Sequence, residues 1–389
     1  MFFLYIRMKG ESKMKKFIIS PDSFKGSMSS IEICGIIKTK IKEFYPHSEV
    51  VEIPIADGGE GTSDCFIQLL GAEKVCIEAT GPYNEKLIGY YARTGDTAVL
   101  ETAMFAGLTL AEGRLNPAST TTFGVGTMIR HAVENGCREI IIGLGGSCTN
   151  DAGTGMASAL GVRFKNKEGE EFIPTGATLG EIAHIDTILA DRFLKDCKIT
   201  AMCDIDNPMY GKTGAAYVYA PQKGADGEMV LLLDKNLMEL ADTIKSQLGV
   251  DVSEIPGSGA AGAMGAGIVA FLNGSLKPGI ETILDLIGFD DKVKDADIIF
   301  TGEGKIDGQS LRGKVVIGVA ARAAKKDVPV VAIVGDVGDG AEAVYDMGVT
   351  AIVSINRVAL PFEKAKARSK KDLADTMDMI LRLMKNRVI

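Results

Sequence analysis

The chain has 389 residues, of which 46% are hydrophobic and 24% charged, and its formal net charge is −8. This length predicts two domains rather than one ordinary core. The acidic balance argues against a nucleic-acid partner, which would require a basic face to meet the phosphates.

No apolar run reaches the roughly 20 residues that a membrane-spanning helix needs, which argues against a membrane partner. The chain has seven cysteines, none in a CxxC pair, a usage that fits reduced thiols and a cytoplasmic location. Residues 1–13 are apolar and then polar, but this stretch is too short for a signal peptide. We expect these residues to be disordered or a start-site extension ahead of Met14.

The N-terminal part has the pattern of a βαβ unit. Residues 16–20 predict a buried strand and residues 27–42 a helix. Ser29 and Glu32, three residues apart near the start of this helix, fit a capping box. Residues 49–55 alternate as a second strand, and the whole is typical of a doubly wound sheet.

The C-terminal part repeats this alternation of strands and helices. Its apolar runs predict strands at residues 296–304, 329–336 and 350–356, and helices at residues 314–326, 341–348 and 362–387. Both ends of the chain therefore have an α/β pattern.

The middle of the chain differs from both ends. Short alternating runs between residues 75 and 110 predict antiparallel strands, and residues 198–220 predict strands again. We expect a discontinuous α/β domain that contains both chain ends, with a mixed α/β domain inserted into it. The predicted domains are residues 14–75 plus 285–389, and residues 76–284.

Two glycine-containing loops follow the first two predicted strands. The loop of residues 22–26 (DSFKG) places a hydroxyl and Lys25 beyond a strand, where ligands bind in open α/β sheets. The loop of residues 56–62 (ADGGEGT) places Asp57 and Glu60 among glycines. These acids suit Mg²⁺ binding or acceptance of a hydroxyl proton. An ordinary capped turn is the alternative for either loop.

A third loop, residues 143–153 (GLGGSCTNDAG), lies between a strongly apolar strand and a helix. Free N–H groups at the start of that helix would favour an anion. The alternative is that Asn150 and Asp151 simply cap the helix. Cys148 stands at the third-glycine position of the dinucleotide fingerprint, which argues against a dehydrogenase.

Two further segments carry acids and lysines. Residues 203–208 (CDIDNP) offer oxygen ligands for Mg²⁺ or a common turn, and Lys223 follows in PQKGA. Residues 308–314 match the spacing of a phosphate-binding P-loop, but Val315 stands where a P-loop has a hydroxyl residue. Glu303 and Asp307 lie beside this near-match, and together they favour binding of a phosphate group.

Together these segments resemble the class I glycerate kinases. The motifs that carry the resemblance are DSFKG, ADGGEG, GLGGSCTNDAG, CDIDNP, PQKGA, PGSGAAGAMGAG and TGEGKIDGQSLRGK, in that order from Met14 to the end. The family implies a flavodoxin-like parallel-sheet domain formed by both chain ends, with a second α/β domain inserted. It also implies ATP, Mg²⁺ and D-glycerate, with 2-phosphoglycerate favoured over 3-phosphoglycerate as product. Cys148 and Ala152 depart from the family pattern, which has Ala and Gly there.

Candidate site residues are assigned by their place in these loops. The predicted catalytic residues are Asp204 and Asp151 as possible proton acceptors, with Lys25 and Lys223 pairing the glycerate carboxylate or the transferring phosphoryl group. The predicted substrate-binding residues are Asp22, Ser23, Lys25, Asp57, Glu60 and Asn150. The predicted ATP-binding residues are Gly143, Gly145, Gly146, Ser147, Gly302, Glu303, Gly304, Asp307 and Lys314. Some of Asp57, Asp204 and Glu303 are predicted to bind Mg²⁺.

Two alternative functions remain open. The chain could phosphorylate another small hydroxy acid on the same scaffold, or it could be a non-catalytic sensor of a sugar acid and a nucleotide. Several acids in glycine loops count against a sensor, because a binding protein has no need of spare carboxylates near phosphates. A homodimer is a further possibility that the sequence does not decide.

Overall fold

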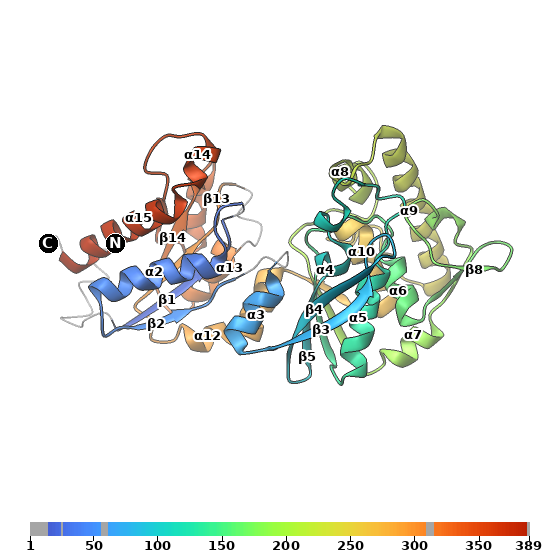
Figure 1. Ribbon diagram of the computed structural model, residues 1–389, viewed down its shortest axis with the longest axis horizontal. Helices are drawn as coiled ribbons and strands as arrows, with labels where there is room; N and C mark the ends of the chain where they lie inside the picture. Colours follow the sequence, from blue (N-terminus) through green and yellow to red (C-terminus); the bar gives the residue numbers. More distant parts are fainter. Residues whose placement is uncertain (1–14, 25, 56–60, 309–314, 387–389) are drawn as a thin grey trace. The chain divides into compact units, whose positions relative to one another are not determined.

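The structure, a computed structural model, describes residues 15–24, 26–55, 61–308 and 315–386 (Figure 1). Contacts within the chain divide it into two units. The first unit contains Met1–Asp57 and Ile280–Ile389, and the second contains Gly58–Gly279. The predicted domain boundaries, near residues 75 and 285, both lie later in the chain than the boundaries of these units. The reason at the first boundary is that helix α3 (Thr62–Leu70) packs against strands of the second unit.

The first unit is built on a five-stranded parallel sheet. Its strands are β1 (Lys16–Pro21), β2 (Glu49–Glu52), β12 (Ile298–Gly302), β14 (Val330–Val334) and β16 (Ala351–Ser354). Their order across the sheet is β16-β14-β12-β1-β2, and every neighbouring pair is parallel. This is the 2-1-3-4-5 order of flavodoxin-like folds, and it confirms the predicted fold of the two chain ends.

Helices α2 (Ser30–Phe44) and α15 (Ser369–Asn386) pack together over this sheet (Figure 1). Their apolar side chains share a core with Phe17 of β1 and Phe300 of β12. The capping box predicted at the start of α2 is present, because Ser29 and Glu32 each accept a hydrogen bond from the other's backbone N–H. The other elements are α11 (Gly279–Leu286), α12 (Phe289–Lys292), β13 (Lys305–Ile306), α13 (Val315–Ala324), β15 (Asp336–Val337), the 3₁₀ helix η4 (Ala341–Met347) and α14 (Phe362–Lys366). The predicted helix at residues 362–387 is thus two helices, α14 and α15.

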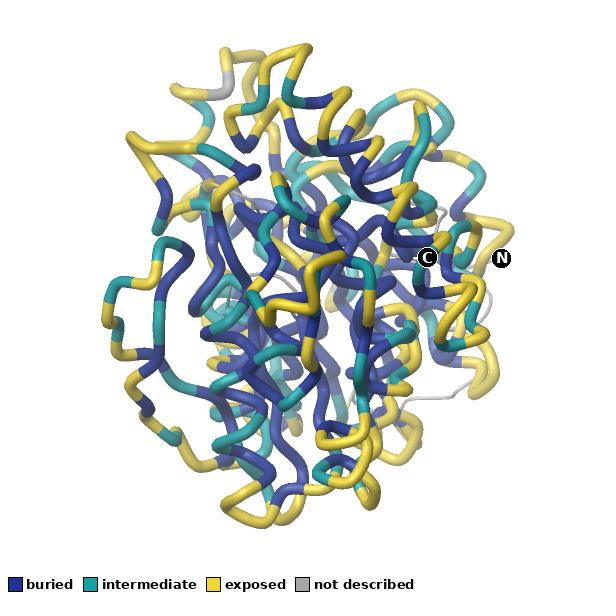
Figure 2. The backbone as a smooth tube through the Cα atoms, turned by 90° about the vertical axis from the view of Figure 1, so that its right-hand side faces the viewer, coloured by how far each residue is buried: buried dark blue, intermediate teal, exposed yellow. Residues whose placement is uncertain are grey.

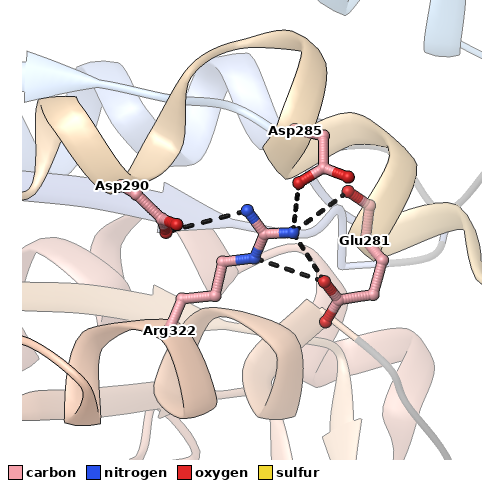
Figure 3. Close-up of polar contacts among 4 residues, drawn as sticks. All are labelled: Glu281, Asp285, Asp290 and Arg322. Carbon is pink, nitrogen blue, oxygen red and sulfur yellow. Dashed lines mark hydrogen bonds and ion pairs between the residues drawn. The ribbon is translucent and has the colours of Figure 1, made fainter.

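Arg322 of α13 joins three helices of the first unit through its guanidinium group (Figure 3). It lies 2.6 Å from the carboxylates of Glu281 and Asp285 on α11, and 3.7 Å from that of Asp290 on α12. The Arg322 side chain is only 10% exposed, so its charge is held mainly by these three acids. The cluster fixes α11 and α12 against α13.

The second unit is built on a six-stranded mixed sheet. Its strands are β3 (Glu73–Thr80), β4 (Lys86–Thr94), β5 (Thr97–Glu101), β6 (Glu139–Gly143), β10 (Lys198–Met202) and β11 (Ser275–Lys277). The pairs β3–β4 and β4–β5 are antiparallel, as predicted for residues 75–110, and β5, β6, β10 and β11 are parallel. Beside it lies a small sheet of β7 (Arg163–Lys165), β8 (Glu171–Phe172) and β9 (His184–Asp186).

The helices of the second unit enclose its apolar core. They are α3, α4 (Ala103–Ala106), α5 (Phe123–Glu134), α6 (Thr154–Leu160), α7 (Ile188–Phe193), α8 (Ala215–Tyr219), α9 (Gly227–Leu248) and α10 (Ala260–Leu272). Three 3₁₀ turns complete the unit: η1 (Thr109–Ala111), η2 (Leu179–Glu181) and η3 (Pro221–Lys223). Strands were predicted within residues 198–220, but β10 is the one strand there and α8 follows it. Figure 2 shows that buried positions lie mostly inside the trace and that exposed positions lie mostly along its outer turns. Within the described ranges, no helix is both long and apolar enough to span a membrane.

Candidate functional site

Three parallel strands of the second unit end at the same edge of the sheet. Glu101 at the end of β5 and Met202 at the end of β10 both pair with Gly143 at the end of β6. Predicted site residues follow β6 and β10 directly, and in α/β sheets ligands bind beyond the carboxyl ends of the strands. The second unit therefore gathers the loop after Gly143 and the loop that contains Asp204 at one edge.

The loop after β6 is held in place along its length. Gly145 and Gly146 are exposed, and Gly146 takes a left-handed conformation with φ at +75°. The backbone of Leu108 donates a hydrogen bond of 2.8 Å to the Gly146 carbonyl, and the Thr120 hydroxyl donates one of 3.1 Å to the Cys148 carbonyl. These contacts fix the positions of the residues from 147 to 151.

Lys223 brings its ammonium group to this loop. It ends the 3₁₀ turn η3, and Gly224 after it is left-handed with φ at +96°. The Lys223 Nζ donates hydrogen bonds to the Ser147 hydroxyl at 2.9 Å and to the Thr149 carbonyl at 2.7 Å. Burial lowers the pKa of Lys223 to about 8, although the nearby Cys148 thiol and Asp151 carboxyl oppose this shift. The predicted residues Lys223 and Ser147 are thus in contact.

Asn150 and Thr149 lie beside the carbonyl that Lys223 contacts, and both are completely buried. Within the described residues, Asn150 Oδ1, Asn150 Nδ2 and Thr149 Oγ1 have no hydrogen-bond partner. A left-handed turn packs closely behind them, since a Cβ atom on Gly262 would lie 1.9 Å from the Thr149 carbonyl oxygen. Backbone packing therefore holds these polar side chains in the interior.

Asp151 is enclosed by donors of its own unit. Its carboxylate accepts hydrogen bonds from the backbone N–H and hydroxyl of Thr122, each at 2.8 Å, and from the N–H groups of Gly153 and Gly155. Burial raises the pKa of Asp151, and the hydrogen bonds from Thr122 oppose this shift. Its carboxylate accepts from N–H groups at the start of α6, so these donors, which were predicted to favour an anionic ligand, already have an acceptor in the protein. The geometry also favours a structural role for Asp151 over a role as base.

Asp204 has a different setting from Asp151. It is exposed, and its Oδ1 accepts a hydrogen bond of 2.8 Å from the backbone N–H of Gly279. The same loop carries Asn207, whose side chain donates to the Thr213 carbonyl at 2.8 Å and accepts from the Tyr219 hydroxyl at 2.6 Å. The loop is therefore braced, while its first acid remains accessible to a ligand.

The first unit places two of the predicted acids at one edge of its sheet. Asp22 follows β1 and Glu303 follows β12, directly after the paired residues Pro21 and Gly302. The Asp22 N–H donates a hydrogen bond of 2.8 Å to the Gly302 carbonyl, and both acids are at most 9% exposed. The two acidic residues, predicted for different roles, are thus neighbours at a carboxyl edge.

The surrounding residues of the first unit differ in their contacts. The Ser23 N–H donates to the Asp22 carboxylate at 2.6 Å, so it supports that acid. Gly302 must be glycine, because a Cβ there would lie 1.9 Å from the Ile333 carbonyl oxygen. Asp307 pairs with the ammonium group of Lys305 at 3.3 Å, and Gly304 lies between Glu303 and Lys305 in a bend.

Four predicted site residues, Lys25, Asp57, Glu60 and Lys314, lie outside the described residues. Among the residues that are described, no group of three or more acidic, histidine or cysteine side chains could together hold a metal ion. Mg²⁺ that accompanies a nucleotide usually takes only one or two carboxylates, with phosphate oxygens and waters as its other ligands. Of the predicted metal ligands, Glu303 lies next to Asp22 at the edge of the first sheet, and Asp204 lies in the second unit.

Sequence reasoning missed Glu101 as a residue of this edge. The side chain is 4% exposed, and it accepts hydrogen bonds from the backbone N–H groups of Ser63 at 2.6 Å and Gly61 at 3.2 Å. Burial raises the pKa of this carboxyl. The sequence feature that could have identified it is an acid that directly follows the run TAVL of a predicted strand. Glu101 holds the start of α3, which leads out of the acidic glycine loop.

Comparisons with known proteins agree along most of the chain. The sequence model of the Glycerate kinase family matches residues 17–385. The chain is 44% identical to a glycerate kinase of Bacillus cereus over 95% of its own length and 98% of that protein. It is 42% identical to the glycerate 2-kinase of Escherichia coli, over 87% of this chain and 90% of the relative. A crystal structure assigned as glycerate kinase 2 from Salmonella typhimurium LT2 superimposes with a TM-score of 0.85 at 37% identity, over 96% of this chain and 99% of that one.

Proposed function

Because the chain belongs to the glycerate kinase family, we propose that it transfers the γ-phosphoryl group of ATP to a hydroxyl group of D-glycerate. The observation that carries this proposal is the buried ammonium of Lys223, which lies beside the loop after β6 with neutral partners in the same unit. An anionic acceptor would supply a negative charge to pair with this ammonium group. The identity to the Escherichia coli glycerate 2-kinase favours 2-phosphoglycerate as the product.

Phosphoryl transfer depends on positioning and charge neutralisation more than on covalent chemistry by the protein. Lys223 binds the anionic acceptor and holds it beside the loop after β6. Asp204 then accepts the proton of the attacking hydroxyl, because it is an exposed carboxylate at the same sheet edge. The oxygen–phosphorus bond to glycerate forms as the bond between the β- and γ-phosphates breaks, and ADP leaves.

The acids of the first unit suit the magnesium ion of the nucleotide. Asp22 and Glu303 would hold Mg²⁺, since both are buried and follow paired residues of neighbouring strands. The ion supplies positive charge to the phosphate oxygens. The backbone around Gly302, directly before Glu303, is fixed by its close approach to Ile333.

Incubation of the protein with ATP, Mg²⁺ and D-glycerate, followed by phosphorus NMR, tests this proposal. We expect ADP together with one new phosphomonoester signal whose coupling pattern identifies carbon 2. A signal from carbon 3 would change the product and keep the kinase. Absence of ADP above background would move the function to another hydroxy acid or to a sensor. The cytoplasmic location and the homodimer stay predictions that cell fractionation and light scattering can test.

A further inference from the structure

Three neighbouring polar side chains in the second unit are buried without the partners that a fold normally supplies. The Lys223 ammonium is 3% exposed, and its two hydrogen bonds go to the neutral Ser147 hydroxyl and Thr149 carbonyl. An ammonium has three donors, so one is left for a further acceptor. Thr149 Oγ1 and both polar atoms of Asn150 have no partner anywhere in the described ranges.

This condition is costly, and at another buried amide of the same unit the donors are paired. A buried polar group without a partner costs about 1–3 kcal/mol. Asn236, which is 5% exposed, donates from its side-chain amide to the carbonyls of Gly176 and Ala177, each at 2.9 Å. The unit therefore pairs both donors of one buried amide and leaves the amide of Asn150 unsatisfied. Polar groups that the fold leaves unsatisfied beside a buried cation indicate a ligand.

We propose that Lys223, Asn150 and Thr149 form the subsite for the carboxylate and the adjacent hydroxyl of an α-hydroxy acid. This inference rests on the proposed function, in which glycerate is the acceptor, and it assigns the groups that recognise the acid. Lys223 pairs with the carboxylate. In the complex without nucleotide, the Asn150 amide donates to the carboxylate and accepts from the hydroxyl on the neighbouring carbon. When that hydroxyl attacks the γ-phosphoryl group, it gives its proton to Asp204 instead. The Thr149 hydroxyl is the third contact.

The chemistry of Asn150 separates a hydroxy acid from a phosphate group. Its two unpartnered atoms are one donor and one acceptor, and a ligand that satisfies both must itself offer an acceptor and a donor. A hydroxy acid offers both, whereas an ionised phosphate of ATP offers acceptors only. The charge agrees as well, because the single positive charge of Lys223 matches the single negative charge of one carboxylate.

The backbone behind the subsite is strained, as is common at binding sites. Ala261, Gly262 and Ala263 are all left-handed, with φ of 53°, 67° and 66°. This conformation costs an alanine about 1–2 kcal/mol, and it persists only where the surroundings enforce it. The strained turn packs against the backbone of Thr149 and Asn150, so it fixes the direction of both side chains.

Titration calorimetry without nucleotide tests the subsite separately from the kinase reaction. The ligands are D-glycerate, lactate and propionate, because lactate and propionate differ only in the α-hydroxyl. The proteins are the wild type, Asn150→Ala and, as matched control, Asn236→Ala. We expect the wild type to bind lactate about 10-fold or more tightly than propionate. Asn150→Ala should lose that difference while its melting temperature stays equal or rises. Asn236→Ala should keep the difference and melt at a lower temperature.

Steady-state kinetics give the second readout. In Asn150→Ala the KM for D-glycerate should rise about 10- to 100-fold, and the KM for ATP should stay within about twofold of the wild type. A rise in the KM for ATP alone would overturn the proposal and assign the residues to phosphate binding. Unchanged KM values for both substrates, or equal binding of lactate and propionate by the wild type, would also overturn it.

Two further arms keep the outcome decisive. If Asn150→Ala does not fold, Thr149→Val replaces it, because valine keeps the shape of threonine and removes only the unpartnered hydroxyl. In Thr149→Val the KM for D-glycerate should rise about 5- to 10-fold. If the wild type binds α-hydroxy acids through Asn150 but consumes no ATP with D-glycerate, the subsite stands and the proposed function fails. If it consumes ATP with D-glycerate while Asn150→Ala has wild-type kinetics, the function stands and the subsite fails.

Discussion

The carboxylate of Asp151 accepts two hydrogen bonds of 2.8 Å from Thr122, one from its backbone N–H and one from its hydroxyl. Thr122 lies at the start of α5, and Asp151 also binds the N–H groups at the start of α6. One buried acid therefore joins the starts of two helices that pack together. This relationship explains why Asp151 belongs to the scaffold of the site.

Replacement of Asp151 by asparagine should therefore lower stability more than it lowers turnover. The asparagine amide would direct its NH₂ group towards a donor, which leaves buried N–H groups unsatisfied and should cost about 2–4 kcal/mol in the free energy of unfolding. Urea denaturation measures this change, and kcat is measured on the folded enzyme at low temperature. A protein of wild-type stability with kcat reduced by orders of magnitude would show that Asp151 is the base after all.

Asp204→Asn should give the reverse pattern. The carboxylate is exposed, and an asparagine Oδ1 can still accept the Gly279 N–H, so stability should stay near that of the wild type. If Asp204 accepts the hydroxyl proton, kcat should fall about 10²- to 10⁴-fold. Asp206→Asn is the matched control, because Asp206 is an exposed acid two residues further along the same loop. Equal activity of the two variants would remove Asp204 as the base.

The sequence predicted the fold better than it predicted the roles of site residues. Local patterns were sufficient for the capping box of Ser29 and Glu32 and for the parallel strands at the two chain ends. The choice between base and helix cap for Asp151 depends on Thr122, which is 29 residues earlier in the chain. Spacing alone cannot show this contact, because burial decides which role an acid takes.

The same limit applies to Lys223. It lies 76 residues from Ser147 in the sequence, and the two meet only because η3 ends at the loop after β6. The family resemblance named both residues, but their contact depends on tertiary packing. Ala152 shows the reverse case: it departs from the family glycine, and the structure gives it a φ of +51°, the conformation for which glycine is suited.

Gly262→Ala should disrupt the loop that carries Thr149 and Asn150. The added Cβ would lie 1.9 Å from the Thr149 carbonyl oxygen and 2.6 Å from Asn150 Cα, and both are backbone atoms that cannot move aside cheaply. We expect a loss of about 1–3 kcal/mol in the free energy of unfolding, together with weaker glycerate binding. Gly227→Ala is the control, because its Cβ would meet nothing within 4 Å. Wild-type stability and binding in Gly262→Ala would contradict the packing described above.

Arg322→Met should destabilise the first unit through its acidic cluster. Without the guanidinium, the carboxylates of Glu281, Asp285 and Asp290 would repel one another beside a buried methionine (Figure 3). Because the three acids are each about half exposed or more, solvent screens them, and we expect a loss of about 1–2 kcal/mol. The loss measured by urea denaturation should shrink at 1 M salt.

The matched control for this cluster is Arg382→Met, since Arg382 pairs with Asp378 on the surface and its side chain is 63% exposed. We expect its unfolding midpoint to stay near that of the wild type at any salt concentration. If Arg322→Met and Arg382→Met have the same effect, the cluster does not hold α11 and α12 against α13.

The buried ammonium of Lys223 should make both glycerate binding and stability depend on pH. Its pKa is lowered to about 8, so the charge that pairs with the carboxylate is present below that pH and lost above it. The KM for D-glycerate should therefore be flat below about pH 7 and rise towards tenfold per unit well above pH 8. A KM that does not change between pH 7 and pH 9.5 would contradict a charged Lys223 at the carboxylate.

Stability should change with pH in the opposite direction. Between the lowered pKa of about 8 and the ordinary lysine value of 10.5, the unfolded chain binds the Lys223 proton and the folded protein does not. This group alone therefore raises the free energy of unfolding as pH increases through that window, by on the order of 2–3 kcal/mol. Lys223→Met should lack this rise. The variant keeps Cys148 and Asp151, the titratable neighbours of Lys223, so the difference between the two urea-denaturation series from pH 7.5 to pH 10 isolates the lysine. Parallel series would show that Lys223 keeps an ordinary pKa.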